Sequence, residues 1–160
     1  DFADHRLPDR VGKALADSGA DPECLTVELT ETFDLVDMVT THRSFRTLRQ
    51  LGVNVSLDDF GTAYATFQRL RYLPFDEIKL DREVMASAGT PVGMAFVNAA
   101  VDLGKTLGMR TIAEGIETPE QADQARELGC DLGQGYYWSS AVPADAIGDL
   151  LVHGSFAAAG

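Results

Sequence analysis

Two adjacent aspartates, Asp58 and Asp59, follow an apolar run in the segment SLDDFGTAY at residues 56–64. Like charges this close repel each other, and burial at the end of a strand strengthens the repulsion. Further carboxylates also lie in or just after short apolar runs of the chain: Glu28, Asp81, Glu114 and Glu117. Carboxylate oxygens suit Mg²⁺ or Mn²⁺, and two such ions about 3.5–4 Å apart can clamp a phosphoryl group during its displacement. The acidic residues therefore predict a two-metal site at Asp58 and Asp59, in which one of these carboxylates is shared by both ions and its neighbour binds one of them.

Lys79 is a single cation among these acids. It could orient or deprotonate an attacking water, or hold a phosphate oxygen. The same residues also fit an enolase-like Mg²⁺ barrel in which Lys79 is the base that removes a proton from carbon. The side chains leave this choice open.

The elements that must position these residues alternate between strand and helix. Apolar periodicity and Gly or Pro punctuation predict strands at 24–31, 53–61, 76–81, 109–115 and 130–137, and helices at 7–19, 37–52, 67–73, 91–108, 118–129 and 143–154. Such alternation predicts an α/β fold with a parallel sheet. Each strand ends on a polar group, and parallel barrels carry their active sites at that end. Because a closed eight-stranded barrel needs about 250 residues, we expect the first strands to lie outside this chain.

The composition excludes several other classes of protein. The 160 residues carry a net charge of −12, which repels DNA, RNA and anionic membranes. No apolar run is long enough to cross a membrane. Cys24 and Cys130 do not have the spacing of metal ligands, and they are typical of unmodified thiols in a reducing cytoplasm. We therefore predict a cytoplasmic protein that acts on a small molecule.

Five ordered motifs, VELTE, LDDFGTAY, LPFDEIKLD, IAEGIET and GCDLGQGYY, resemble those of the EAL-domain family of bacterial cyclic di-GMP phosphodiesterases. The resemblance extends from residue 5 to residue 151. It implies a TIM-like (β/α)8 barrel of the EAL type. It also implies metal-dependent hydrolysis of cyclic di-GMP to linear pGpG with two Mg²⁺ or Mn²⁺ ions, in second-messenger signalling.

The resemblance also assigns roles to individual residues. The metal ligands that it implies are Glu28, Asp58, Asp59, Asp81 and Glu114, with Asp58 bridging the two ions and Asp59 binding one of them. The other catalytic residues that it implies are Lys79, Glu117, Gln134 and Glu31. Lys79 would contact the catalytic water, with Asp81 beside it. Gln134 would position water or substrate, and Glu117 would support the site. Glu31 would anchor the loop after DDFG, which in this family takes part in dimerisation.

Two departures from the family pattern bear on activity. The Glu-Ala-Leu motif and a metal-binding Asn are expected upstream of residue 1, so residues 1–160 are predicted to be a partial EAL domain that is inactive by itself. Ala63 stands where many relatives have glycine, which would strain a left-handed loop by roughly 1 kcal/mol. The alternative is therefore a degenerate EAL domain that binds cyclic di-GMP or regulates a partner protein. The expected partners are a second copy of the chain and an upstream sensor or GGDEF domain.

Overall fold

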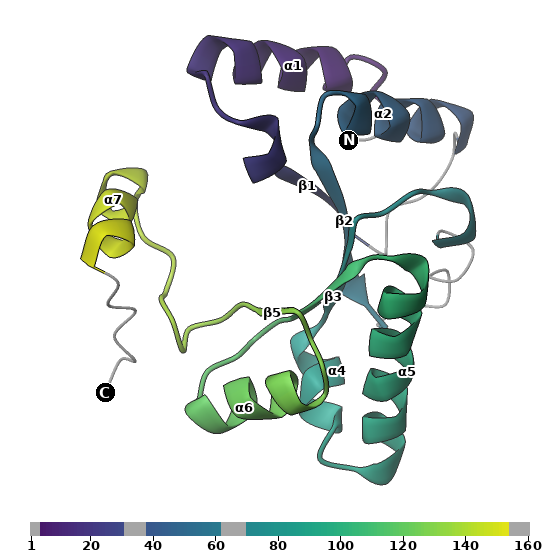
Figure 1. Cartoon of the computed structure of the whole chain (residues 1–160), viewed down its shortest axis with the longest axis vertical. Helices are drawn as coiled ribbons and strands as arrows, with labels where there is room; N and C mark the ends of the chain where they lie inside the picture. Colours follow the sequence, from purple (N-terminus) through teal and green to yellow (C-terminus); the bar gives the residue numbers. More distant parts are fainter. Residues whose placement is uncertain (1–3, 31–37, 62–69, 154–160) are drawn as a thin grey trace.

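The computed structural model describes residues 4–30, 38–61 and 70–153, in which strands and helices alternate around one sheet (Figure 1). The sheet contains β1 (Thr26–Thr30), β2 (Asn54–Phe60), β3 (Glu77–Leu80), β4 (Arg110–Ala113) and β5 (Leu132–Gly133). All neighbouring strands are parallel, and their order in the sheet is their order in the chain. This order is that of a barrel, because a doubly wound sheet reverses its strand order at a switch point. The predicted α/β fold with a parallel sheet is confirmed.

The described helices lie around the outside of the curved row of strands, except the C-terminal one, which stands apart from the strands (Figure 1). They are α1 (Leu7–Ser18), α2 (Met38–Gln50), α4 (Arg82–Ser87), α5 (Pro91–Leu107), α6 (Pro119–Glu127) and α7 (Ala144–His153), with a short 3₁₀ turn at Pro22–Cys24. None of the helices in the described ranges is long and apolar enough to cross a membrane.

The helix ends follow their sequence signals. Thr118 begins α6 as a capping box, in which its hydroxyl accepts from the Gln121 amide and the Gln121 side chain accepts from the Thr118 amide. Gly19 and Gly108 end α1 and α5 in the left-handed conformation that glycine adopts at low cost. The predicted cap at Thr118 and the predicted glycine end at residue 19 are confirmed.

Two elements differ from the prediction. The short helix α4 was not expected, because six residues give too little periodicity to recognise. The strand predicted at 130–137 was wrong in length, since β5 covers Leu132–Gly133 alone among these residues. The chain turns there because Gly135 lies against the Ile116 backbone, where a Cβ atom would lie 2.0 Å from the Ile116 carbonyl oxygen. The helix predicted at 67–73 begins outside the described residues.

The two faces of the sheet have different chemistry. Val55, Leu57, Ile78 and Leu80 point to the helices and are fully buried. They form one core with residues of α2 and α5, namely Phe45, Leu48, Val97 and Val101. Alternation places the polar side chains on the opposite face of the same strands. The sheet therefore presents polar residues on the face that the helices do not cover.

Aspartates secure the starts of two strands, away from the end where the acidic motifs lie. Asp76 accepts a hydrogen bond from the Val55 amide at 2.9 Å, and its own amide donates to the Val55 carbonyl oxygen at 2.8 Å. Asp131 and Thr111 repeat this reciprocal pair at 2.8 and 2.9 Å. These hydrogen bonds fix the register at the strand starts, and the register in turn sets the position of the side chains at the strand ends.

Candidate metal centre

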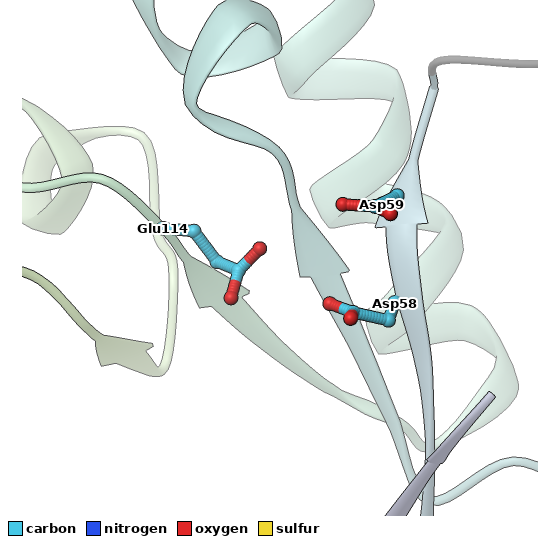
Figure 2. Close-up of side chains that lie close together, drawn as sticks. All are labelled: Asp58, Asp59 and Glu114. Carbon is cyan, nitrogen blue, oxygen red and sulfur yellow. The ribbon is translucent and has the colours of Figure 1, made fainter. Parts of the chain in front are cut away.

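Three carboxylates meet at the C-terminal ends of two strands. Asp58 and Asp59 lie near the end of β2, and Glu114 follows β4. One oxygen from each side chain lies within 4.8 Å of the others. Figure 2 shows both aspartates pointing from β2 toward Glu114. Residues that lie 55 or more positions apart in the sequence thus form one acidic group.

A β-bulge turns the two aspartates to the same side. Leu57 pairs with Ile78 and Phe60 with Leu80, so that two residues of β2 stand opposite the single Lys79 of β3. In a regular strand, Asp58 and Asp59 would point to opposite faces. Asp59 instead has a φ of 58°, the one left-handed residue other than glycine in the described chain. This backbone conformation brings the second carboxylate into the group.

Lys79 lies beneath the acidic group, and its side chain is only 5% exposed. Its Nζ atom lies 2.7 Å from Glu114 Oε1, 2.8 Å from Glu28 Oε1 and 3.1 Å from Asp58 Oδ1. A buried ammonium ion needs such partners, because burial without compensation would favour the neutral amine. Lys79 therefore connects β1, β2 and the residue after β4 through one cation.

The pKa values reflect this crowding. Burial alone would lower the pKa of Lys79, but its contacts with Glu114, Glu28 and Asp58 outweigh burial and raise the pKa above its ordinary value. Burial raises the pKa of Glu114; the Lys79 ammonium opposes this rise, and the charges of Asp58 and Glu28 add to it. One ammonium ion thus leaves excess negative charge among the carboxylates.

The described residues fit a divalent cation. Oxygen ligands at about 2.0–2.1 Å from Mg²⁺ lie no more than about 4.2 Å apart, so the group is close to the size that one ion requires. Asp58 Oδ1 is buried and accepts no well-aligned hydrogen bond, although Lys79 Nζ is 3.1 Å away. The Lys79 ammonium compensates part of the negative charge of this buried oxygen, and a bound ion would supply the aligned partner that the oxygen lacks. The donor set is all oxygen, as Mg²⁺ and Mn²⁺ prefer.

The structure does not bring every predicted site residue into this group. Glu28 contacts Lys79 but is 46% exposed and stands outside the three-carboxylate group. Asp81 accepts a hydrogen bond from the Glu83 amide at 2.7 Å and so caps α4. Gln134 is exposed, and its backbone pairs with Ala113 and Ile116. The predictions for Glu31 and for the effect of Ala63 lie outside the described residues.

Glu117 faces a partner that the sequence did not indicate. Its carboxylate binds both terminal nitrogens of Arg82, at 2.6 and 3.2 Å. Arg82 directly follows the LPFDEIKLD motif, and a basic residue there carries no signal of its own in a single sequence. The pair therefore joins the start of α4 to the loop that follows Glu114.

Comparison with known proteins shows the family. The family model described as EAL domain matches residues 1–141. The cyclic di-GMP phosphodiesterase NbdA of Pseudomonas aeruginosa is 36% identical over 146 residues, which are 91% of this chain and 19% of that protein. This chain therefore belongs to the EAL domain family, and the resemblance inferred from the five motifs is confirmed.

Solved structures agree with this assignment. The phosphodiesterase MucR of P. aeruginosa, in complex with c-di-GMP, superposes with a TM-score of 0.81 at 35% identity, over 91% of this chain and 60% of that chain. BlrP1 of Klebsiella pneumoniae, in a manganese and cy-diGMP complex, superposes with a TM-score of 0.75 at 28% identity, over 82% of this chain and 34% of that chain. The TIM-like fold class of the EAL type is thus confirmed. The chain spans about a fifth of the length of the curated relatives that it matches first.

Proposed function

We propose that this chain is part of a phosphodiesterase that hydrolyses cyclic di-GMP to linear pGpG with two Mg²⁺ or Mn²⁺ ions. The observation that carries the proposal is the meeting of Asp58, Asp59 and Glu114 within 4.8 Å, above the buried cation of Lys79. The names of the relatives support the substrate, since NbdA and RocR are cyclic di-GMP phosphodiesterases and MucR was solved with c-di-GMP. The manganese complex of BlrP1 supports the type of ion. We also propose that residues 1–160 form one partial EAL domain.

The charges of the described side chains favour divalent cations. Glu28, Asp58, Asp59 and Glu114 contribute a formal charge of −4, and Lys79 contributes +1. The remaining −3 would repel the phosphate groups of a dinucleotide. One divalent ion does not cancel this excess, and two ions do. The electrostatics of the site therefore agree with a two-ion mechanism.

Each side chain has a distinct task in this mechanism. Bound ions would neutralise charge on the phosphoryl group and lower the pKa of the attacking water. Asp58 would be shared by both ions, Asp59 and Glu114 would hold one of them, and Glu28 would hold the other. Lys79 would hold the carboxylates in place and donate to the attacking water or a phosphate oxygen.

Four further residues would have auxiliary roles in this mechanism. Asp81 would stand beside the water, Gln134 would contact water or substrate, and Glu31 would anchor the following loop. The fourth, Glu117, would support the site from its pair with Arg82. A homodimer and an upstream sensor or GGDEF domain remain predictions.

The experiment compares Asp58→Asn with the unsubstituted full-length protein. Chromatography would follow the conversion of cyclic di-GMP to pGpG in Mg²⁺ or Mn²⁺. Asparagine keeps the size of the side chain and removes the bridging charge, so we expect turnover to fall by several orders of magnitude. The matched control is Asp123→Asn, an exposed aspartate on α6 that pairs with Arg126. Near-normal turnover by Asp58→Asn would refute the bridging role.

A second candidate function is binding without hydrolysis. Lys79 already connects Glu28, Asp58 and Glu114, so the described site could hold its shape without any ion. In that case the full-length protein would bind cyclic di-GMP and form no pGpG at saturating Mg²⁺ or Mn²⁺. Equilibrium binding measured beside the turnover assay separates the two functions.

A further inference from the structure

The loop that carries Glu114 is held by an arginine on the neighbouring strand–helix unit. Arg82 is the first residue of α4, and Glu117 directly precedes the N-cap of α6. Arg82 Nη1 lies 2.6 Å from Glu117 Oε1, and Nη2 lies 3.2 Å from Oε2. Two parallel hydrogen bonds between planar groups define the orientation of both side chains, which a single contact does not.

The stem of Arg82 also covers the backbone of this loop. Gly115 has a φ of 67°. A Cβ atom on Gly115 would lie 2.5 Å from Arg82 Cβ and 2.6 Å from Cγ. The arginine therefore touches the loop twice, with its stem against Gly115 and its guanidinium group on Glu117. These two contacts flank Ile116 and begin at the residue next to Glu114.

The rest of the loop is held mainly through its backbone. The Glu114 amide donates to the Leu80 carbonyl oxygen at 3.0 Å, and the Ile116 amide donates to the Gln134 carbonyl oxygen at 3.1 Å. The Glu117 amide donates to Gln121 Oε1 at 2.7 Å. These bonds place the main chain between β3 and β5. The contacts of Arg82 then limit rotation of the loop at Gly115, where the absence of a side chain leaves the backbone free to turn.

We propose that Arg82 is a positioning residue that clamps the Glu114–Glu117 loop, so that the Glu114 carboxylate faces Asp58, Asp59 and Lys79. Glu117 acts in this arrangement through Arg82 and does not touch the reacting groups. The assignment of the clamp rests on the loop geometry, and its effect on ion binding rests on the proposed function.

Folding stability is a poor explanation for this pair. The side chains of Arg82 and Glu117 are 62% and 37% exposed, and ion pairs of this kind contribute little to stability. Lysine at position 82 would keep the charge but could not form the two parallel bonds. Arg82→Lys therefore removes the two parallel hydrogen bonds and keeps the positive charge. Glu117→Gln removes the negative charge of the partner and keeps the size of its side chain.

Amide hydrogen exchange in the full-length protein, without added ions, tests the clamp. We expect exchange across residues 114–117 to rise at least tenfold in Arg82→Lys and in Glu117→Gln, while the thermal transition stays in place. The control is Arg126→Lys, which makes the same substitution in an exposed ion pair within α6. Unchanged exchange across 114–117 in both clamp variants would overturn the proposal.

Titration with Mn²⁺, followed by electron paramagnetic resonance, tests the link to Glu114. Outer groups that orient metal ligands typically contribute 10–100-fold to affinity, so Arg82→Lys should weaken Mn²⁺ binding about tenfold. Saturating Mn²⁺ should then restore most of the turnover, which the loss of a reacting group would not allow. Unchanged Mn²⁺ affinity in Arg82→Lys would overturn the positioning role. Absence of Mn²⁺ binding in the unsubstituted protein would refute the proposed metal site, and the exchange measurement would still decide the clamp.

Discussion

The left-handed backbone of Asp59 leads to a prediction that separates folding from ion binding. Its φ of 58° brings the Asp59 carboxylate beside Asp58, at the bulge opposite Lys79. We therefore consider three substitutions at this position: to Asn, to Gly and to Ala. All three remove the carboxylate. They differ in how well the new residue accepts the left-handed conformation.

The expected effects on stability follow from the backbone. A left-handed residue with a Cβ atom costs roughly 1–2 kcal/mol, and aspartate and asparagine tolerate this conformation better than alanine. Without ions, Asp59→Gly should therefore be more stable than Asp59→Ala by about 1 kcal/mol. For a domain of this size, that difference corresponds to about 2–4 °C in melting temperature. Asp59→Asn should melt close to the unsubstituted protein.

The expected effects on ion binding are the same for all three variants. An ion at 100 times its Kd stabilises the folded state by about 2.7 kcal/mol, which corresponds to about 5–10 °C here. Loss of the Asp59 ligand should weaken binding at least tenfold, and the stabilisation at the same ion concentration should then fall to about 1.4 kcal/mol or less. Thermal denaturation of the full-length protein with and without Mn²⁺ measures both effects in one series.

Two results would contradict this reasoning. Equal stability of Asp59→Gly and Asp59→Ala without ions would mean that the backbone at this position is not strained. An unchanged Mn²⁺-dependent shift in Asp59→Asn would mean that the carboxylate does not bind the ion. Because the first result concerns the bulge and the second concerns the metal, either one can fail by itself.

Three further predictions concern the loop, the ion and the thiols. Gly115→Ala should destabilise the fold by about 2–3 kcal/mol in thermal denaturation, because the new Cβ atom would collide with Arg82. The control is Gly108→Ala: Gly108 is also left-handed, but a Cβ atom there would have no neighbour within 4 Å, so the cost should be about 1 kcal/mol. Ca²⁺ added to the Mg²⁺-loaded enzyme should inhibit hydrolysis without displacing cyclic di-GMP, because Ca²⁺ accepts longer and more numerous ligands; equal turnover with Ca²⁺ would refute this. Burial raises the pKa of the Cys130 thiol from 9.0 to about 11. Iodoacetamide at pH 8 should therefore modify the exposed Cys24 before Cys130. The free energy of unfolding should also fall as the pH rises from 9 toward 11, because the Cys130 thiol loses its proton in the unfolded chain before it does so in the folded one.

Much of the scaffold is predictable because its signals are local. Periodic apolar residues and terminal Gly, Pro or Thr place α1, α5 and α6 close to their observed bounds. Alternation in β2 and β3 predicts which side chains face the helices, and the buried Val55 and Ile78 agree with it. These features depend on residues within one turn or one strand of each other, so a single sequence contains them.

The unpredicted features depend on contacts between segments. The end of β5 is set by Gly135, which lies against the Ile116 backbone of the loop after β4. The pairing of Arg82 with Glu117 joins residues 35 positions apart. In each case, the deciding partner lies on another element, and a local pattern carries no information about it.

The acidic group itself illustrates where side-chain alternation fails as a guide. Alternation correctly places Asp58 on the face opposite the helices, but it would send Asp59 toward them. The chain breaks alternation at two points, the left-handed Asp59 beside Asp58 and the left-handed Gly115 beside Glu114. Both breaks lie one residue after a carboxylate of the group and at the end of a strand. The geometry of the site therefore resides as much in two backbone conformations as in the carboxylates, and a substitution at Gly115, which carries no functional group, should alter the site as well as the fold.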